Sequence, residues 1–135
     1  ATLLANVAFD ASVWELWPYL TRGATLHIVP EEIRSDAVML IDWLNRRGIS
    51  ICFLPTPLAE AVMLSDSRAD GSLRVVLTGG DKLHRGVGEG LGFRLVNHYG
   101  PTEGTVVATA ATPLRGLLRA APARQAVPIE RRIST

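Results

Sequence analysis

Residues 49–64 read ISICFLPTPLAEAVML, a short apolar run followed, after a proline, by a second apolar segment. The run Ile49–Leu54 is typical of a buried strand, and Pro57–Leu64 predicts a short helix. The alternation continues along the chain, with strands predicted at 24–29, 73–77 and 93–96 and helices at 10–20, 36–47 and 83–91. Continuous apolar strands between helices indicate a mainly parallel sheet covered on both faces, so the predicted fold class is α/β.

Two of the predicted helices carry start or stop signals. In 10–20, Ser12 and Glu15 have the spacing of a capping box, in which each side chain bonds the other residue's backbone N–H, and Gly23 ends the helix. Gly48 stops the helix at 36–47, whose apolar residues fall largely on one face. These residues are Val38, Met39, Ile41, Trp43 and Leu44. The helix at 83–91 is weakened by three glycines.

The loops that follow the strands are the expected place for a site. In open parallel sheets, ligands bind beyond the carboxyl ends of the strands. The loops after Leu54, Leu77 and Val96, at residues 55–57, 78–81 and 97–103, are therefore expected to lie together at one rim.

Composition limits the function classes. The 135 residues, 47% of them hydrophobic, suit one compact domain, and the net charge of +1 gives no electrostatic case for nucleic acid or membrane lipid as a partner. Beyond Pro113 five arginines accompany one glutamate, which predicts a solvated basic tail with little regular structure.

Cysteine and histidine usage points to neither a disulfide nor a metal site. Cys52 is the only cysteine, and its apolar neighbours predict a buried, inert thiol. His27 and His84 have no partner at metal-ligand spacing and are expected at surface or strand positions. No apolar stretch reaches the length of a membrane span, and Ala1–Ala5 lacks the features of a signal peptide, so a cytoplasmic piece of a longer chain is expected.

Residues 97–103, NHYGPTE, combine several groups that suit a nucleotide. Tyr99 could stack on a planar ring, Thr102 could bond a phosphate oxygen, and Glu103 could hold a magnesium ion that bridges phosphates. An ordinary turn explains the Gly-Pro pair equally well.

Upstream residues also allow two interpretations. Gly79 and Gly80 would let a ligand approach the main chain, or would simply form a strand-to-helix turn. Asp10 at the mouth of an apolar pocket would pair with an ammonium group, although aspartate is also a frequent helix cap. Trp14, one helical turn further on, could line the same pocket or be an ordinary core aromatic.

Two motifs resemble those of the adenylation domains of nonribosomal peptide synthetases, which belong to the adenylate-forming superfamily. Residues 97–103 resemble the N-x-Y-G-P-T-E motif, and residues 9–15, FDASVWE, are similar to the F-D-x-S segment. The resemblance extends from about Asn6 to Pro113. It implies that residues 1–113 are part of the large N-terminal portion of such a domain, and that 114–135 form a divergent basic tail.

The resemblance implies sites for ATP and Mg²⁺. Tyr99 would lie against the adenine, Thr102 would contact the phosphate as a catalytic residue, and Glu103 would be the second catalytic residue and bind magnesium. The strand-end loop at Thr78–Gly80 would pass beside the adenine. The positions carried over as ATP-binding are Gly79, Gly80, Asn97, Tyr99, Gly100 and Thr102.

The resemblance also implies an amino-acid pocket, in which Asp10 meets the α-amino group. The lining is mostly apolar, which favours an aliphatic side chain of moderate size. It resembles the family's leucine-type pockets, with His98 where an amide is more familiar. The positions are Asp10, Ala11, Trp14, Phe53, Leu77, Gly79, His98, Val106 and Val107.

By this resemblance the whole enzyme is an amino-acid-activating ligase, with peptidyl carrier and condensation domains as partners and phosphopantetheine on the carrier. The family's phosphate loop and catalytic lysine have no counterpart in these residues, and Glu130 and Arg132 replace the usual Gly and Pro of V-P-I-G-x-P, so the segment alone is expected to be inactive. One alternative is a ligase for a fatty or aryl acid, which an unpaired buried Asp10 would disfavour. The other is a non-catalytic binding or interaction fragment.

Overall fold

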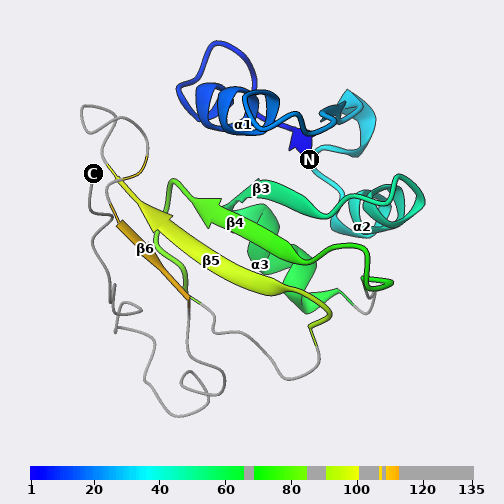
Figure 1. The fold of residues 1–135 in the computed structure, drawn as a ribbon. Helices are drawn as coiled ribbons and strands as arrows, with labels where there is room; N and C mark the ends of the chain where they lie inside the picture. The colour runs from blue at the N-terminus through cyan, green and yellow to red at the C-terminus, as the bar shows by residue number, and fades with distance from the viewer. Residues whose placement is uncertain (66–68, 85–90, 101–106, 108, 113–135) are drawn as a thin grey trace.

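The computed structural model describes residues 1–65, 69–84, 91–100, 107 and 109–112 (Figure 1). The predicted α/β class is confirmed, with helices packed on a mainly parallel sheet. The elements in chain order are β1 (Thr2–Leu3), α1 (Ala11–Leu20), β2 (His27–Ile28), the 3₁₀ turn η1 (Glu31–Ile33), α2 (Ala37–Arg46), β3 (Ile51–Pro55), α3 (Thr56–Leu64), β4 (Val75–Gly79), β5 (Arg94–Tyr99) and β6 (Thr109–Ala111).

The larger sheet has the strand order β3-β4-β5-β6. The first three strands are parallel, with Cys52 opposite Val76 and Val76 opposite Leu95. Strand β6 runs antiparallel to β5. The sequence did not predict this strand, because three small residues carry no apolar run long enough to mark a strand. A second, two-stranded parallel sheet joins β1 to β2.

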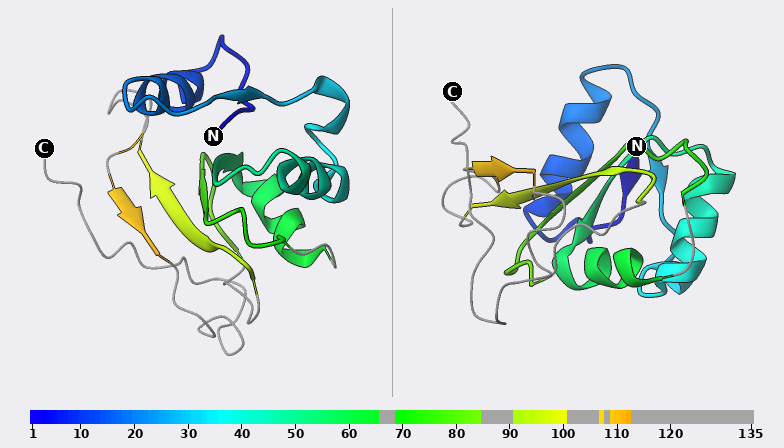
Figure 2. Two further views of the ribbon diagram at one scale, coloured as in Figure 1. Left: turned by 45° about the vertical axis from the view of Figure 1, so that its right-hand side comes forward. Right: turned by 90° about the horizontal axis from the view of Figure 1, so that it is seen from below.

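The two faces of the larger sheet meet different helices. Because successive strand residues point to opposite faces, Cys52, Val76 and Leu95 lie on one face and join the core cluster with residues of α2 and α3. Phe53 and Leu77 lie on the other face. The right-hand view of Figure 2 shows α2 and α3 on one side of the sheet and α1 on the other. The face toward α1 is the one that carries the predicted pocket residues of the strands.

The helix predicted at 36–47 is confirmed as α2, and its signals act as expected. Asp36 is the N-cap and accepts hydrogen bonds from the backbone N–H groups of Val38 and Met39, both at 2.9 Å. Gly48 follows with φ of 61°, a left-handed conformation that glycine adopts without strain. The predicted face is confirmed at Ile41 and Leu44, which are buried together with Leu40. It was wrong at Val38 and Met39, which are exposed.

Two other predictions need correction. The strand expected at 24–29 is reduced to β2, since β1, its partner among the described residues, is two residues long, and Ile28 is 68% exposed. In the helix expected at 83–91, Leu83 and His84 are not helical, and residues 85–90 lie outside the described residues. The tail predicted from 114 also lies outside them.

The thiol of Cys52 is fully buried in β3, as predicted. Burial, and to a smaller extent the nearby Glu15, raise the pKa of this thiol to about 12. A thiol with such a pKa is almost wholly protonated at neutral pH and is therefore a poor nucleophile.

Candidate functional site

The carboxyl ends of β3, β4 and β5 lie side by side, as predicted. Pro55 is opposite Gly79, and Thr78 is opposite Asn97. The hydroxyl of Thr56 donates to the carbonyl oxygens of Gly79 at 3.2 Å and Asp81 at 3.1 Å, which fastens the start of α3 to the loop after β4. The carboxyl ends of these strands and the described residues that follow them therefore form one rim, and residues 101–103 of the third predicted loop lie outside the described residues.

Gly79 is required by the packing of the sheet itself. A Cβ built on Gly79 would lie 2.8 Å from the carbonyl oxygen of His98, a backbone atom of the neighbouring strand. Gly80, with φ of 93° and no atom within 4 Å of an added Cβ, is needed for its backbone conformation instead. The absence of a side chain at Gly79 thus lets the backbone of β5 approach closely. This packing explains the glycine without a ligand.

Three predicted pocket residues lie at the N-terminal end of α1. Asp10 is at the N-cap position with helical backbone angles, is exposed, and makes no side-chain capping hydrogen bond. Ala11 and Trp14 follow and are half-buried. The interpretation of Asp10 as a helix cap is therefore wrong, since its carboxylate is not used in that way.

The remaining described pocket residues come from the sheet face toward α1. Phe53 and His98 are buried, whereas Leu77 is half-buried. The imidazole of His98 meets the indole of Trp14 in an edge-to-face contact, which joins the helical and the strand residues. Val107 is half-buried, and Thr102, Glu103 and Val106 lie outside the described residues.

This face is apolar but holds two unpaired polar atoms. Burial lowers the pKa of His98, so its imidazole is neutral at physiological pH. Within the described residues, neither Nδ1 of His98 nor Nε1 of Trp14 has a hydrogen-bond partner, although both atoms are buried. The contact between the two rings thus brings one unpaired donor, the indole N–H, and a neutral imidazole to the same place.

The ends of β4 and β5 hold a second pair of unpaired polar atoms. Thr78 and Asn97 are opposite one another, and the hydroxyl of Thr78 and Oδ1 of Asn97 are buried without a partner among the described residues. Two residues beyond Asn97, Tyr99 is 62% exposed. Buried oxygens beside an open aromatic ring fit a planar, hydrogen-bonding base such as adenine. Gly100, half-buried, follows directly.

Glu15 and Ser12 do not form the predicted capping box. Both lie inside α1, and the hydroxyl of Ser12 donates to the carbonyl oxygens of Phe9 at 2.7 Å and Val7 at 3.3 Å. The Glu15 carboxylate turns to β1, and burial raises its pKa to about 7. The same spacing suits both arrangements, so the sequence could not separate them.

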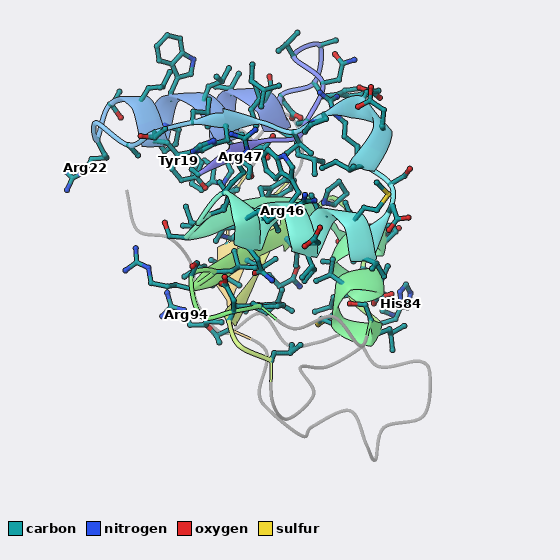
Figure 3. All side chains as sticks on the ribbon, turned by 90° about the vertical axis from the view of Figure 1, so that its right-hand side faces the viewer. Tyr19, Arg22, Arg46, Arg47, His84 and Arg94 are labelled. Atoms are coloured by element: carbon teal, nitrogen blue, oxygen red, sulfur yellow. The ribbon has the colours of Figure 1, made fainter. Side chains whose placement is uncertain are left out.

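Two exposed arginines lie away from this rim, whereas the exposed Lys82 follows Asp81 in the loop after β4 and lies near it. Arg94 is exposed at the start of β5, the end opposite the rim, and Arg22 is exposed just beyond α1. Figure 3 shows both side chains directed outward. The described residues include no cluster of three His, Cys, Asp or Glu that could hold a metal, and none of their helices is long and apolar enough to cross a membrane.

Comparison with known proteins gives consistent matches. A family model described as AMP-binding enzyme matches residues 2–130. One of the proteins that make up the linear gramicidin synthase of Brevibacillus parabrevis is 57% identical over 110 residues, covering 82% of this chain and 1% of that protein. Surfactin synthase subunit 2 of Bacillus subtilis (strain 168) is 53% identical over 107 residues, which cover 79% of this chain and 3% of that protein. The chain thus spans a very small part of these relatives.

Solved structures show the same fold. The Vibrio cholerae adenylation domain AlmE, crystallised with glycyl-adenosine-5'-phosphate, is similar with a TM-score of 0.71 at 22% identity, over 97% of this chain and 25% of that chain. IdnL7 is similar with a TM-score of 0.74 at 25% identity, over 94% and 27%. Both likenesses cover nearly all of this chain but about a quarter of the other.

Proposed function

Because this chain belongs to the family of AMP-binding enzymes, we propose that it forms part of a ligase that joins an amino acid to ATP, giving an aminoacyl-adenylate and pyrophosphate. Its similarity to proteins of the linear gramicidin and surfactin synthases supports an amino acid as the substrate. In such a synthetase the activated amino acid would pass to phosphopantetheine on a peptidyl carrier domain, beside a condensation domain.

The observation that carries this proposal is the free carboxylate of Asp10. It is exposed at the N-cap position of α1 and makes no capping bond, so it remains available to a ligand. An ammonium group is its natural partner, since charge-assisted hydrogen bonds to carboxylates are among the strongest in proteins. A fatty or aryl acid has no such group, which makes the amino acid the better substrate.

Leucine or a near relative is the proposed side chain. Phe53, Leu77 and the indole of Trp14 offer an apolar surface, and the neutral state of His98 avoids placing a charge beside it. Burial of each methylene on such a surface is worth about 0.8 kcal/mol, so a branched aliphatic side chain would be preferred. Val106 and Val107 would complete the pocket.

ATP would lie along the rim at the ends of β4 and β5. Asn97, Thr78 and the open ring of Tyr99 suit the adenine. Thr102 would contact the phosphates, and Glu103 would hold Mg²⁺, which neutralises phosphate charge when bound. The reaction needs this neutralisation more than a protein nucleophile, because the substrate carboxylate itself attacks the α-phosphate.

The test is amino-acid-dependent exchange of pyrophosphate into ATP by the complete enzyme that contains this segment, with a panel of amino acids. We expect leucine or another aliphatic amino acid to give the highest rate. A charged or aromatic amino acid as the best substrate would reject the pocket assignment. Exchange that depends only on a fatty or aryl acid would reject the amino acid as substrate class.

A further inference from the structure

Glu15 has an unusual position for a carboxylate. It lies in the middle of α1 and is 0% exposed. Its Oε2 accepts hydrogen bonds from the backbone N–H groups of Leu4 at 3.0 Å and Ala5 at 2.6 Å, while Oε1 is buried without a partner among the described residues. Glutamate is rarely buried to this degree without a paired cation, so the residue needs an explanation.

The two N–H groups that Glu15 binds lie where β1 ends and the chain turns toward Asp10. Between them and α1, Asn6 closes a turn, with its side-chain oxygen accepting from the N–H of Ala8 at 2.9 Å. Ser12 then binds the carbonyl oxygens of Val7 and Phe9. Two buried side chains of α1 therefore hold this segment, Glu15 at its beginning and Ser12 near its end.

We propose that Glu15 is a positioning residue, whose buried carboxylate fastens the segment 4–10 to α1 and thereby fixes the Asp10 carboxylate at the mouth of the amino-acid pocket. The inference rests on the proposed function, because it assigns to Asp10 the recognition of the α-amino group. The Asp10 side chain makes no capping hydrogen bond that would fix its position. The position of Asp10 is therefore set by the segment before it and by α1 after it.

Stability alone does not account for a carboxylate at this position. Burial of an ionised group in an apolar interior is costly, and well-packed apolar replacements of buried charges are often neutral or stabilising. The raised pKa of Glu15, about 7, reflects this cost. An apolar side chain could not accept hydrogen bonds from two backbone N–H groups at once. These two hydrogen bonds set the direction of segment 4–10.

The experiment uses the complete enzyme and measures KM separately for the amino acid and for ATP in pyrophosphate exchange. Glu15→Met keeps the length of the side chain but has no strong acceptor, and Glu15→Gln keeps one acceptor oxygen. We expect Glu15→Met to raise the amino-acid KM about tenfold or more with the ATP KM unchanged, and Glu15→Gln to restore most of that loss. Hydrogen exchange in a peptide spanning residues 4–10 should be faster in Glu15→Met.

The matched control is Asp36→Ala, which removes an acceptor of two N–H groups just as Glu15→Met does. Asp36 also accepts from two backbone N–H groups, but at the start of α2 and away from the pocket, so both KM values should stay at the parent level. An amino-acid KM within twofold of the parent in folded Glu15→Met would overturn the inference, as would an equal rise in both KM values. If Glu15→Met does not fold, Glu15→Asp, which shortens the reach by one methylene, takes its place under the same criteria. A parent enzyme without amino-acid-dependent exchange would instead reject the proposed function.

Discussion

The imidazole of His98 and the indole of Trp14 pack nearly perpendicular to one another, with ring centroids 5.5 Å apart and planes at 84°. One ring comes from a strand of the central sheet and the other from the helix that carries Asp10. The pair therefore joins the side of the proposed pocket that would recognise the amino group to the side that would receive the amino-acid side chain.

Replacing His98 tests what this contact contributes. His98→Asn removes the aromatic pair but leaves a polar group of the kind more familiar at this position. We expect the free energy of unfolding to fall by about 1 kcal/mol, the usual worth of an aromatic pair, while kcat/KM for leucine stays within about threefold. Chemical denaturation measures the free energy of unfolding, and pyrophosphate-exchange kinetics measure kcat/KM. A change of preferred substrate would show that His98, and not the apolar lining, sets the selectivity.

Asp10→Asn separates recognition from capping. Asp10 is exposed in the free chain, so the effect depends on the bound substrate covering it. If the carboxylate then pairs with the substrate ammonium in a desolvated pocket, its loss costs on the order of 3 kcal/mol, or more than a hundredfold in kcat/KM for the amino acid. The melting temperature should not change, because Asp10 makes no capping bond.

The comparison variant is Asp36→Ala, which removes a side chain that does cap a helix. It should lower the free energy of unfolding by about 1 kcal/mol and leave the kinetics unchanged. Full activity in Asp10→Asn, or a loss explained by unfolding, would argue against a role of Asp10 in binding.

The pKa of Glu15 predicts how stability depends on pH. Burial raises this pKa from 4.5 to about 7, so between these values the folded chain holds a proton that the unfolded chain has released. The free energy of unfolding should therefore fall as pH rises from 4.5 to 7, by up to about 3 kcal/mol, and Glu15→Gln should remove this dependence. Denaturation curves between pH 5 and 8 test it. Among the charged groups around Glu15, Arg34 opposes the shift, and burial outweighs it.

A Cβ at position 79 should force β4 and β5 apart. Gly79→Ala would place the new atom 2.8 Å from the carbonyl oxygen of His98, and the backbone there cannot move without weakening the strand pairing. We expect a loss on the order of 2 kcal/mol or more. Gly71→Ala is the control, since Gly71 has φ of 96° but open space around it, and should cost about 1 kcal/mol. Equal losses in the two variants would contradict the steric explanation.

Much of the sheet could be predicted because its strands are continuous apolar runs. Strands β3, β4 and β5 and helices α2 and α3 fall within a few residues of their predicted positions. The shared rim followed from their parallel order. Strand β6 and the short β1 could not be found, because their pairing depends on partners distant in the chain and not on a local pattern.

The residues of the candidate site could be predicted from motifs, but the contacts that hold those residues in place could not. Asp10 and Trp14 were named from a motif, and the structure brings Trp14 against His98. Their positions as ligand contacts stay a prediction. Glu15 was misread because its spacing from Ser12 fits a local cap, whereas its actual partners, Leu4 and Ala5, belong to a segment before the helix. Contacts of this kind depend on tertiary packing that a local spacing rule does not contain.

The buried thiol of Cys52 makes the chain's only cysteine a reporter of the sheet's integrity. A labelling reagent can reach the sulfur only when the core around it opens, because the side chain lies wholly within that core. The modification rate would then follow the population of opened molecules multiplied by the reactivity of a free thiol. Substitutions on the sheet face toward α1 could thus be ranked by the rate at which Cys52, on the other face, is modified.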